Sequence, residues 1–100
     1  MADLYEIKEA EERVILIAVS VNEEDDTAAS LDELEELVKT AGATAVARSV
    51  QKRERIHPGH YLGTGKIEEL KAMLLAYDAT GIVCDDELSP AQLRNLEQML

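Results

Sequence analysis

The apolar positions of this chain begin with an uninterrupted run and continue as helical repeats. Residues 14–19 read VILIAV, six consecutive apolar residues rich in β-branched side chains. A strand that is apolar on both faces is typical of the interior of a parallel sheet, because helices cover such a sheet on either side. The run therefore predicts a buried strand over residues 13–21.

The next apolar positions recur at helical spacing and end at a glycine. They are Leu31, Leu34, Leu37, Val38 and Ala41. Ser30 and Glu33 have the spacing of a capping box, and Gly42 is a natural left-handed stop. We expect a helix that is capped by Ser30 and ends at Gly42, after a charged connection over residues 22–27.

Two further pairs of strand and helix follow. The segment 43–51 favours a strand, and a second helix capped by Thr64 carries one apolar stripe. That stripe consists of Ile67, Leu70, Met73, Leu74 and Tyr77. Residues 82–84 form a short apolar strand, after which Ser89 and Gln92 have the spacing of a capping box and predict a third helix.

This alternation predicts an α/β domain with an open parallel sheet and flanking helices. We expect a flavodoxin-like strand order of 2-1-3. A fourth strand normally follows a third helix in such sheets, and the sequence up to Leu100 has no candidate for it, so the last strand is expected to be missing. Residues 1–12 are an acidic lead-in, and residues 13–100 form the domain, which we expect to be truncated.

Composition narrows the class of protein. The chain has 100 residues and a single cysteine, Cys84, which excludes an internal disulfide framework. Its acidic start does not resemble a secretion signal, and its longest apolar run is far shorter than the roughly 20 residues of a membrane-spanning helix. These features predict a cytoplasmic protein without a membrane span.

The charge of the chain reverses between Arg48 and Lys66. The net charge is −11, yet this stretch holds five basic residues against Glu54 alone, so it carries +4 and the remainder carries −15. Both histidines, His57 and His60, lie in the same stretch. The stretch is therefore where we expect the functional site.

Most of that charge falls on a connection longer than the usual βα loop, and long loops on α/β domains are often functional. Residues 53–66 offer phosphate partners, one ring for stacking and glycines, and they predict a contact with RNA or another anion. The candidate residues are Arg53, Arg55, His57, His60, Tyr61, Gly63, Gly65 and Lys66. An alternative is that the basic side chains neutralise the acidic helices of their own domain.

The glycines before the second helix raise the alternative of nucleotide binding. The GTGK sequence at residues 63–66 opens a helix after a strand, and backbone N–H groups there can hold a phosphate. The Walker A spacing fails at His60 and Ile67, and the Rossmann spacing fails at Glu68. The simpler interpretation is that both glycines serve turn geometry.

We assign no catalytic or metal-binding residue. The carboxylates of residues 85–87 follow the third strand, where doubly wound folds bind ligands and where Mg²⁺ can bind, but they more simply solvate the turn. His57 and His60 lack cysteine partners for zinc. Cys84 is expected to be a small core residue.

Two segments, in this order, resemble the N-terminal domain of HflX-type GTPases. They are YLGTGK at residues 61–66 and DDELSP at residues 85–90, the latter followed by RNLE at residues 94–97. The resemblance covers nearly the whole chain from Arg13 onward. It implies a cytosolic, ribosome-associated GTPase that binds the large ribosomal subunit, with this domain approaching the rRNA.

The resemblance also implies what lies outside the chain. In the family, linker helices and a G domain follow, where GTP and Mg²⁺ bind, so this chain is expected to be non-catalytic and to hold no cofactor of its own. The expected partners are the large ribosomal subunit with its rRNA and the G domain of the same protein, while an exposed sheet edge would favour self-association. Two alternatives stay open: a nucleotide-binding domain that uses residues 63–66 with Asp85 or Asp86 on Mg²⁺, and a regulatory module that packs on the G domain.

Overall fold

The sheet is parallel and has the predicted strand order. The computed structural model describes residues 12–21, 26–52 and 61–100. Its three strands are β1 (Arg13–Ser20), β2 (Thr44–Lys52) and β3 (Gly81–Cys84). They lie side by side in the order β2-β1-β3, with both neighbours parallel to β1. The α/β class and the order 2-1-3 are confirmed.

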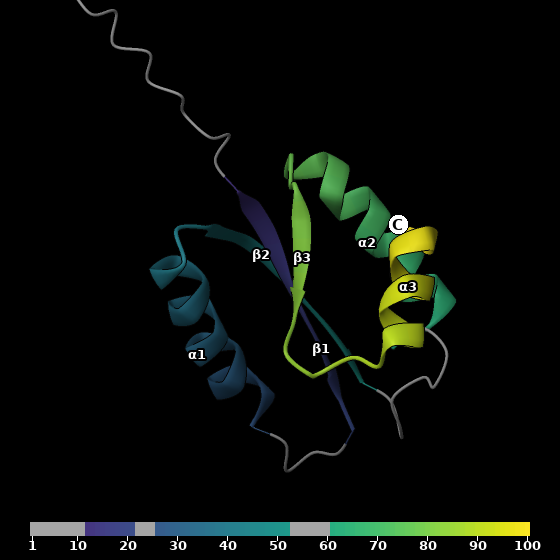
Figure 1. Cartoon of the computed structure of the whole chain (residues 1–100), viewed down its shortest axis with the longest axis horizontal. Coiled ribbons are helices and arrows are strands. Elements are labelled where there is room, and N and C mark those ends of the chain that lie inside the picture. Colours follow the sequence, from purple (N-terminus) through teal and green to yellow (C-terminus); the bar gives the residue numbers. More distant parts are fainter. Residues whose placement is uncertain (1–11, 22–25, 53–60) are drawn as a thin grey trace, which may run out of the picture.

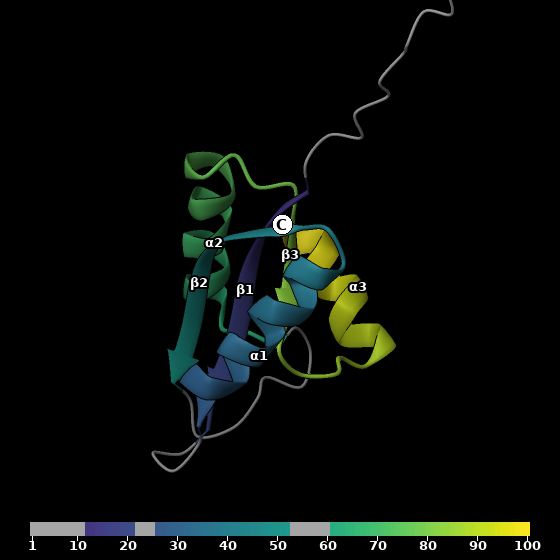
Figure 2. The same ribbon diagram turned by 90° about the vertical axis from the view of Figure 1, so that its left-hand side faces the viewer.

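Helices cover both faces of this sheet. They are α1 (Thr27–Thr40), α2 (Thr64–Ala76) and α3 (Pro90–Met99). Figure 1 shows α1 on one side of the strands and α2 with α3 on the other, and Figure 2, turned by 90°, shows α1 in front of the strands. No helix in the described ranges is both long enough and apolar enough to cross a membrane.

The central strand explains the uninterrupted apolar run. Successive side chains of a strand point to opposite faces, and both faces of β1 are covered. One set packs with α2 and α3, and the other packs with α1. The first set is Ile15, Ile17 and Val19, and the second is Val14, Leu16 and Ala18, all of them buried. Each fully buried large side chain contributes roughly 1.5 to 3 kcal/mol to folding.

An irregularity in β2 decides which way its end faces. Val14 is paired with Ala45 but Ile15 is paired with Ala47, so Val46 is an extra residue on β2. Such a bulge shifts the alternation of side chains by one position. Beyond it, Val19 is paired with Gln51, which places the Gln51 side chain on the face that carries α2.

Two of the three predicted helix caps were wrong. Helix α1 begins after Asp26, whose carboxylate accepts a hydrogen bond from the Ala29 N–H at 3.4 Å, and Ser30 lies inside the first turn. Helix α2 begins after Gly63, which has no side chain to cap it, so Thr64 is the first helical residue and not the cap. In both helices a hydroxyl residue that follows the actual cap also fits a cap pattern: Ser30 follows Asp26, and Thr64 follows Gly63.

The other helix boundaries agree with the sequence. Ser89 and Gln92 form the predicted capping box, with bonds of 3.0 and 3.1 Å between each side chain and the backbone N–H of the other residue. Gly42 follows α1 with a φ of +92°, a conformation that residues with a Cβ rarely adopt. The turn at Gly42 leads directly into β2.

Candidate functional site at the carboxyl edge of the sheet

Four of the eight predicted contact residues can be placed. Arg53, Arg55, His57 and His60 lie outside the described residues, and the predictions made for them stay open. The described members are Tyr61, Gly63, Gly65 and Lys66, which lie just before α2 or in its first turn. They show how the basic segment rejoins the fold.

Tyr61 is an anchor and not an exposed ring. It is 0% exposed, and its hydroxyl accepts a hydrogen bond from the Val19 N–H at 3.1 Å and donates one to Asp86 Oδ2 at 2.8 Å. Burial and the neighbouring Asp86 raise the pKa of Tyr61. The prediction that this ring is available to stack on RNA was therefore wrong, since the ring lies in the core that α2 and α3 form with the sheet.

The backbone at Tyr61 is held in an unusual conformation. Its φ is +70°, which is uncommon for a residue other than glycine and requires support from its surroundings. Leu62 and Ile67, which flank the start of α2, are both buried in the same cluster as Tyr61. Their positions relative to the cap are those of a hydrophobic staple. The apolar Leu62, directly after Tyr61 and just before the helix, was the sequence signal that Tyr61 points inward.

Gln51 closes the base of the segment. Its Oε1 accepts a hydrogen bond from the Gly63 N–H at 2.8 Å, so the end of β2 is joined to the start of α2. We call Gln51, Tyr61 and Gly63 the neck, because residues 53–60 leave and rejoin the described fold there. Gln51 was not among the predicted site residues, since nothing in a single glutamine indicates its partner.

The neck also changes the interpretation of the two glycines. Gly63 has a φ of −70° and Gly65 lies in α2, so neither is in the left-handed region and turn geometry does not require glycine at either position. The Gly63 N–H, one of the first donors that a phosphate would meet at this helix start, already binds Gln51. The predicted nucleotide site thus has one donor fewer than an open helix start.

The basic residues differ in how far they are neutralised. Arg48 lies 2.7 Å from Asp32 and 3.5 Å from Glu35, both on α1, and the hydrogen bond to Asp32 raises the pKa of Arg48. For Arg48, neutralisation within the domain therefore holds. Lys66 is 20% exposed at its side chain and lies 3.4 Å from Glu69, a weak pair.

An acidic hollow of about 350 Å³ lies at the carboxyl ends of β1 and β3. Three aspartates contribute to its lining, Asp26, Asp85 and Asp86. Asp85 accepts a hydrogen bond from the Ser30 hydroxyl at 3.0 Å and Asp86 accepts one from Tyr61, so the neighbouring carboxylates serve different elements. No metal-binding group of three or more side chains is found among the described residues. The negative charge of these carboxylates disfavours a phosphate in this hollow.

The sequence matches one family model and several curated relatives. Residues 28–100 match the model of a family described as GTP-binding GTPase N-terminal. Over 100 residues the chain is 70% identical to the GTPase HflX of Lacrimispora saccharolytica. The matched region covers all of this chain and 24% of that protein. It is 40% identical over 97 residues to the GTPase HflX of Caldanaerobacter subterraneus subsp. tengcongensis, covering 97% of this chain and 22% of the relative.

A more distant relative gives the same result. The GTPase HflX of Escherichia coli (strain K12) is 32% identical over 96 residues, covering 96% of this chain and 22% of the relative. The chain thus spans about a quarter of the length of these curated relatives. With the family match across most of the domain and a parallel sheet in the expected order, the chain belongs to the GTP-binding GTPase N-terminal family and is an HflX-type N-terminal domain.

Proposed function

We propose that this chain is the non-catalytic N-terminal module of an HflX-type GTP-binding protein and contacts the rRNA of the large ribosomal subunit through residues 53–66. The neck is the main support for this role. The hydrogen bond of 2.8 Å between Gln51 and Gly63 joins the described residues on either side of positions 53–60, which carry basic residues in an otherwise acidic chain. A short positive stretch in an otherwise negative chain suits a local contact with RNA phosphates.

The distribution of charge limits the size of this contact. Residues outside the stretch from Arg48 to Lys66 carry a net −15, which opposes wrapping RNA over a broad surface. Arg48 is bound to α1, so the contact falls to the basic residues of the segment 53–66, which the exposed Lys52 directly precedes. Tyr61 acts in this scheme as an anchor of the segment and not as a ligand of RNA. A protein that works on ribosomes in this way acts in the cytoplasm.

The alternatives have less support among the described residues. A nucleotide at the start of α2 would compete with Gln51 for the Gly63 N–H, and Asp86 is already bound to Tyr61. No contact within residues 12–21, 26–52 and 61–100 favours packing on a G domain over contact with RNA. The nucleotide alternative is tested as a rival in the thermal unfolding experiment below.

Co-sedimentation of the 100-residue chain with purified large and small ribosomal subunits, over a series of salt concentrations, tests the proposal. We expect the chain to pellet with large subunits at low salt and to be released as salt rises. Equal binding to both subunits, or none at low salt, would contradict the ribosomal role. In parallel, thermal unfolding with GTP or ATP and Mg²⁺ should show no shift in Tm, because a shift of several degrees would favour the nucleotide alternative.

A further inference from the structure

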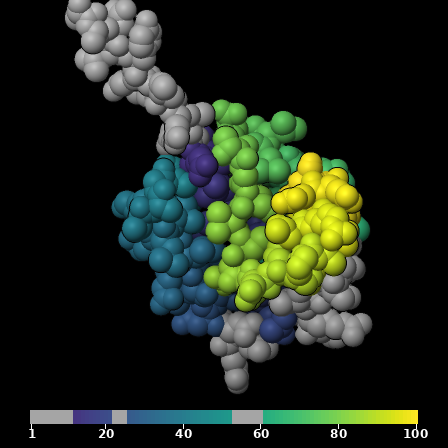
Figure 3. All heavy atoms as spheres, viewed as in Figure 1, coloured from purple at the N-terminus to yellow at the C-terminus, as the bar shows by residue number. Residues whose placement is uncertain are grey.

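The turn after β3 carries two adjacent aspartates that serve different parts of the fold. Asp85 accepts a hydrogen bond from the Ser30 hydroxyl on α1 at 3.0 Å, and Asp86 accepts one from the Tyr61 hydroxyl of the neck at 2.8 Å. Figure 3 shows the yellow-green residues that follow β3 at the surface, beside the blue first turns of α1. One turn therefore holds both the start of α1 and the neck.

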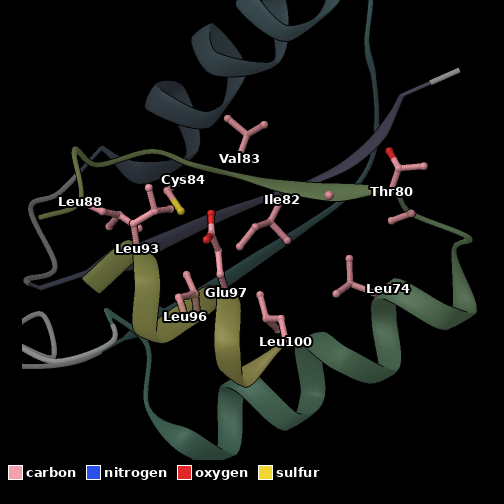
Figure 4. Close-up of a pocket in the computed structure, with 12 residues that line it drawn as sticks. Leu74, Thr80, Ile82, Val83, Cys84, Leu88, Leu93, Leu96, Glu97 and Leu100 are labelled. Atoms are coloured by element: carbon pink, nitrogen blue, oxygen red, sulfur yellow. The ribbon is translucent and has the colours of Figure 1, made fainter. Parts of the chain in front are cut away.

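Apolar packing fixes this turn on both sides of the aspartates. Cys84 ends β3 and Leu88 lies before α3, and both pack against the core cluster that contains Tyr61. Figure 4 shows Cys84, Leu88 and, on α3, Leu93 among the residues that line a second hollow, of about 730 Å³, along β3. The carboxylates thus stand on a turn whose two ends are attached to the core.

The Tyr61 hydroxyl continues the hydrogen bonding of the sheet where β3 ends. The Ile17 carbonyl accepts a hydrogen bond from the Asp85 N–H at 2.9 Å. In a parallel sheet every second residue of a strand bonds to the same neighbour, so the N–H of Val19 also points to the β3 side. The Tyr61 hydroxyl accepts a hydrogen bond from this N–H at 3.1 Å. A side chain thus takes the place of a backbone carbonyl and satisfies a buried N–H.

Asp86 directs the proton of this hydroxyl. Burial and the neighbouring Asp86 raise the pKa of Tyr61, so the hydroxyl keeps its proton and donates it. Donation to Asp86 fixes the rotation of the O–H bond and leaves the oxygen lone pairs for the Val19 N–H. Hydrogen bonds to a carboxylate are about twice as strong as neutral ones. Asp86 therefore holds Tyr61 at the carboxyl edge of the sheet.

We propose that Asp86 is a positioning residue for the contact with RNA, an inference that rests on the proposed function. Through the Tyr61 hydroxyl, Asp86 fixes the point at which residues 53–60 rejoin the described fold. A segment that is already positioned loses less conformational freedom when it binds. A negative side chain beside the neck thus strengthens the binding of phosphates.

Charge alone predicts the opposite effect. Asp86 is an exposed residue, and a carboxylate near a phosphate site weakens binding by repulsion. Asp85 provides the matched comparison, because it has the same charge at the adjacent position but is bound to Ser30 on α1. Removal of Asp85 should therefore show the effect of charge without the effect of positioning.

Binding of a full-length HflX protein that carries this domain to large ribosomal subunits separates the two effects. Asp86→Ala removes the charge and the acceptor and should weaken binding about tenfold, with an unchanged salt slope. Asp86→Asn removes the charge but keeps an oxygen for the Tyr61 hydroxyl, so it should bind at least as tightly as the natural protein. Asp85→Ala should not weaken binding. Asp86→Ala should add nothing to Tyr61→Phe, because Asp86 acts through that hydroxyl.

Hydrogen exchange of the Val19 N–H in the same full-length proteins gives a second readout that does not depend on the ribosome. This N–H should exchange at least about tenfold faster in Asp86→Ala and at nearly the natural rate in Asp86→Asn. An unchanged rate in Asp86→Ala would overturn the positioning of Tyr61 by Asp86.

The binding results distinguish failure of this proposal from failure of the ribosomal role. Equal or tighter binding by Asp86→Ala, when the natural protein binds, would overturn the proposal and leave the ribosomal role intact. An equal loss in Asp85→Ala and Asp86→Ala would also overturn it, because both would then act through the fold as a whole. Failure of the natural protein to bind would overturn the ribosomal role, and with it the role of Asp86 in RNA binding.

Discussion

The hydroxyl of Tyr61 lies 2.8 Å from a carboxylate oxygen of Asp86, at a point where the side chain of Tyr61 is completely buried. The same hydroxyl accepts a hydrogen bond from the N–H of Val19, near the carboxyl end of the central strand β1. One side chain thus joins the end of the basic segment to the residues that follow β3 and to β1. Loss of these hydrogen bonds should therefore both destabilise the domain and release Tyr61 from β1 and Asp86.

Tyr61→Phe should lower the free energy of unfolding by about 1 to 3 kcal/mol, because it leaves a buried N–H and a carboxylate without their partner. Urea unfolding of both proteins measures this loss. Tyr77→Phe is the control, since Tyr77 is 44% exposed, and it should change stability by less than about 0.5 kcal/mol. Equal effects of the two substitutions would show that the Tyr61 hydroxyl contributes nothing.

Stability should fall at alkaline pH, in part through Cys84. Burial, with a smaller effect of Asp86, raises the pKa of Cys84 from 9.0 to about 12. The folded state therefore keeps this proton longer than the unfolded state. The resulting stability is complete below pH 9 and is lost as the pH rises towards 12, by up to about 1.4 kcal/mol per pH unit.

Cys84→Ala should remove this part of the pH dependence. The unfolding free energy of both proteins, measured at several pH values between about 8 and about 10, isolates the thiol because tyrosines titrate mainly above that window. The variant should lose less stability over this window than the natural chain, whatever the cost of the smaller side chain. Parallel curves would contradict the assignment.

Gln51→Ala should loosen the neck without changing the charge of the chain. The substitution removes the acceptor of the Gly63 N–H and should cost about 0.5 to 1.5 kcal/mol of stability. If the neck positions the basic segment, binding to large ribosomal subunits should weaken while its salt dependence stays the same. Gln98→Ala, at an exposed position on α3, is the control and should alter neither quantity.

The glycines should respond in opposite directions. Gly42→Ala forces a Cβ into a backbone with φ of +92° and should destabilise the domain by about 1 to 2 kcal/mol. At Gly65, in the first turn of α2, an added Cβ would meet nothing within 4 Å, so Gly65→Ala should stabilise the domain by about 0.5 to 1 kcal/mol. Thermal unfolding measures both, and destabilisation by Gly65→Ala would indicate a role that the backbone does not explain.

Much of the fold could be predicted because its signals are local. The run at residues 14–19 has no polar position to expose, which left a doubly covered central strand as the simplest solution. The box at Ser89 likewise depends on residues three apart in sequence. Cap choice failed at α1 because Asp26 and Ser30 both fit a helix start, and only the packing of the helix on β1 decides between them.

The candidate site was less predictable because its contacts join residues far apart in sequence. Asp86 lies 25 positions from Tyr61, and Gln51 lies 12 positions from Gly63. The basic neighbours of Tyr61 suggested an exposed ring, while the apolar Leu62 beside it was the better guide. Charge located the segment, but it could not show that Arg48 is bound to α1.

Binding of a full-length HflX protein that carries this domain to large ribosomal subunits, across a salt series, tests the central claim most directly. The variant Arg53→Ala/Arg55→Ala/Lys66→Ala removes three charges from the segment, and Lys39→Ala/Lys71→Ala/Arg94→Ala removes three elsewhere. We predict weaker binding for the first variant, with a slope of log affinity against log salt shallower by roughly two to three, and no change for the second. Unchanged affinity and slope for the first variant, or an equal loss in both, would contradict contact of this segment with rRNA.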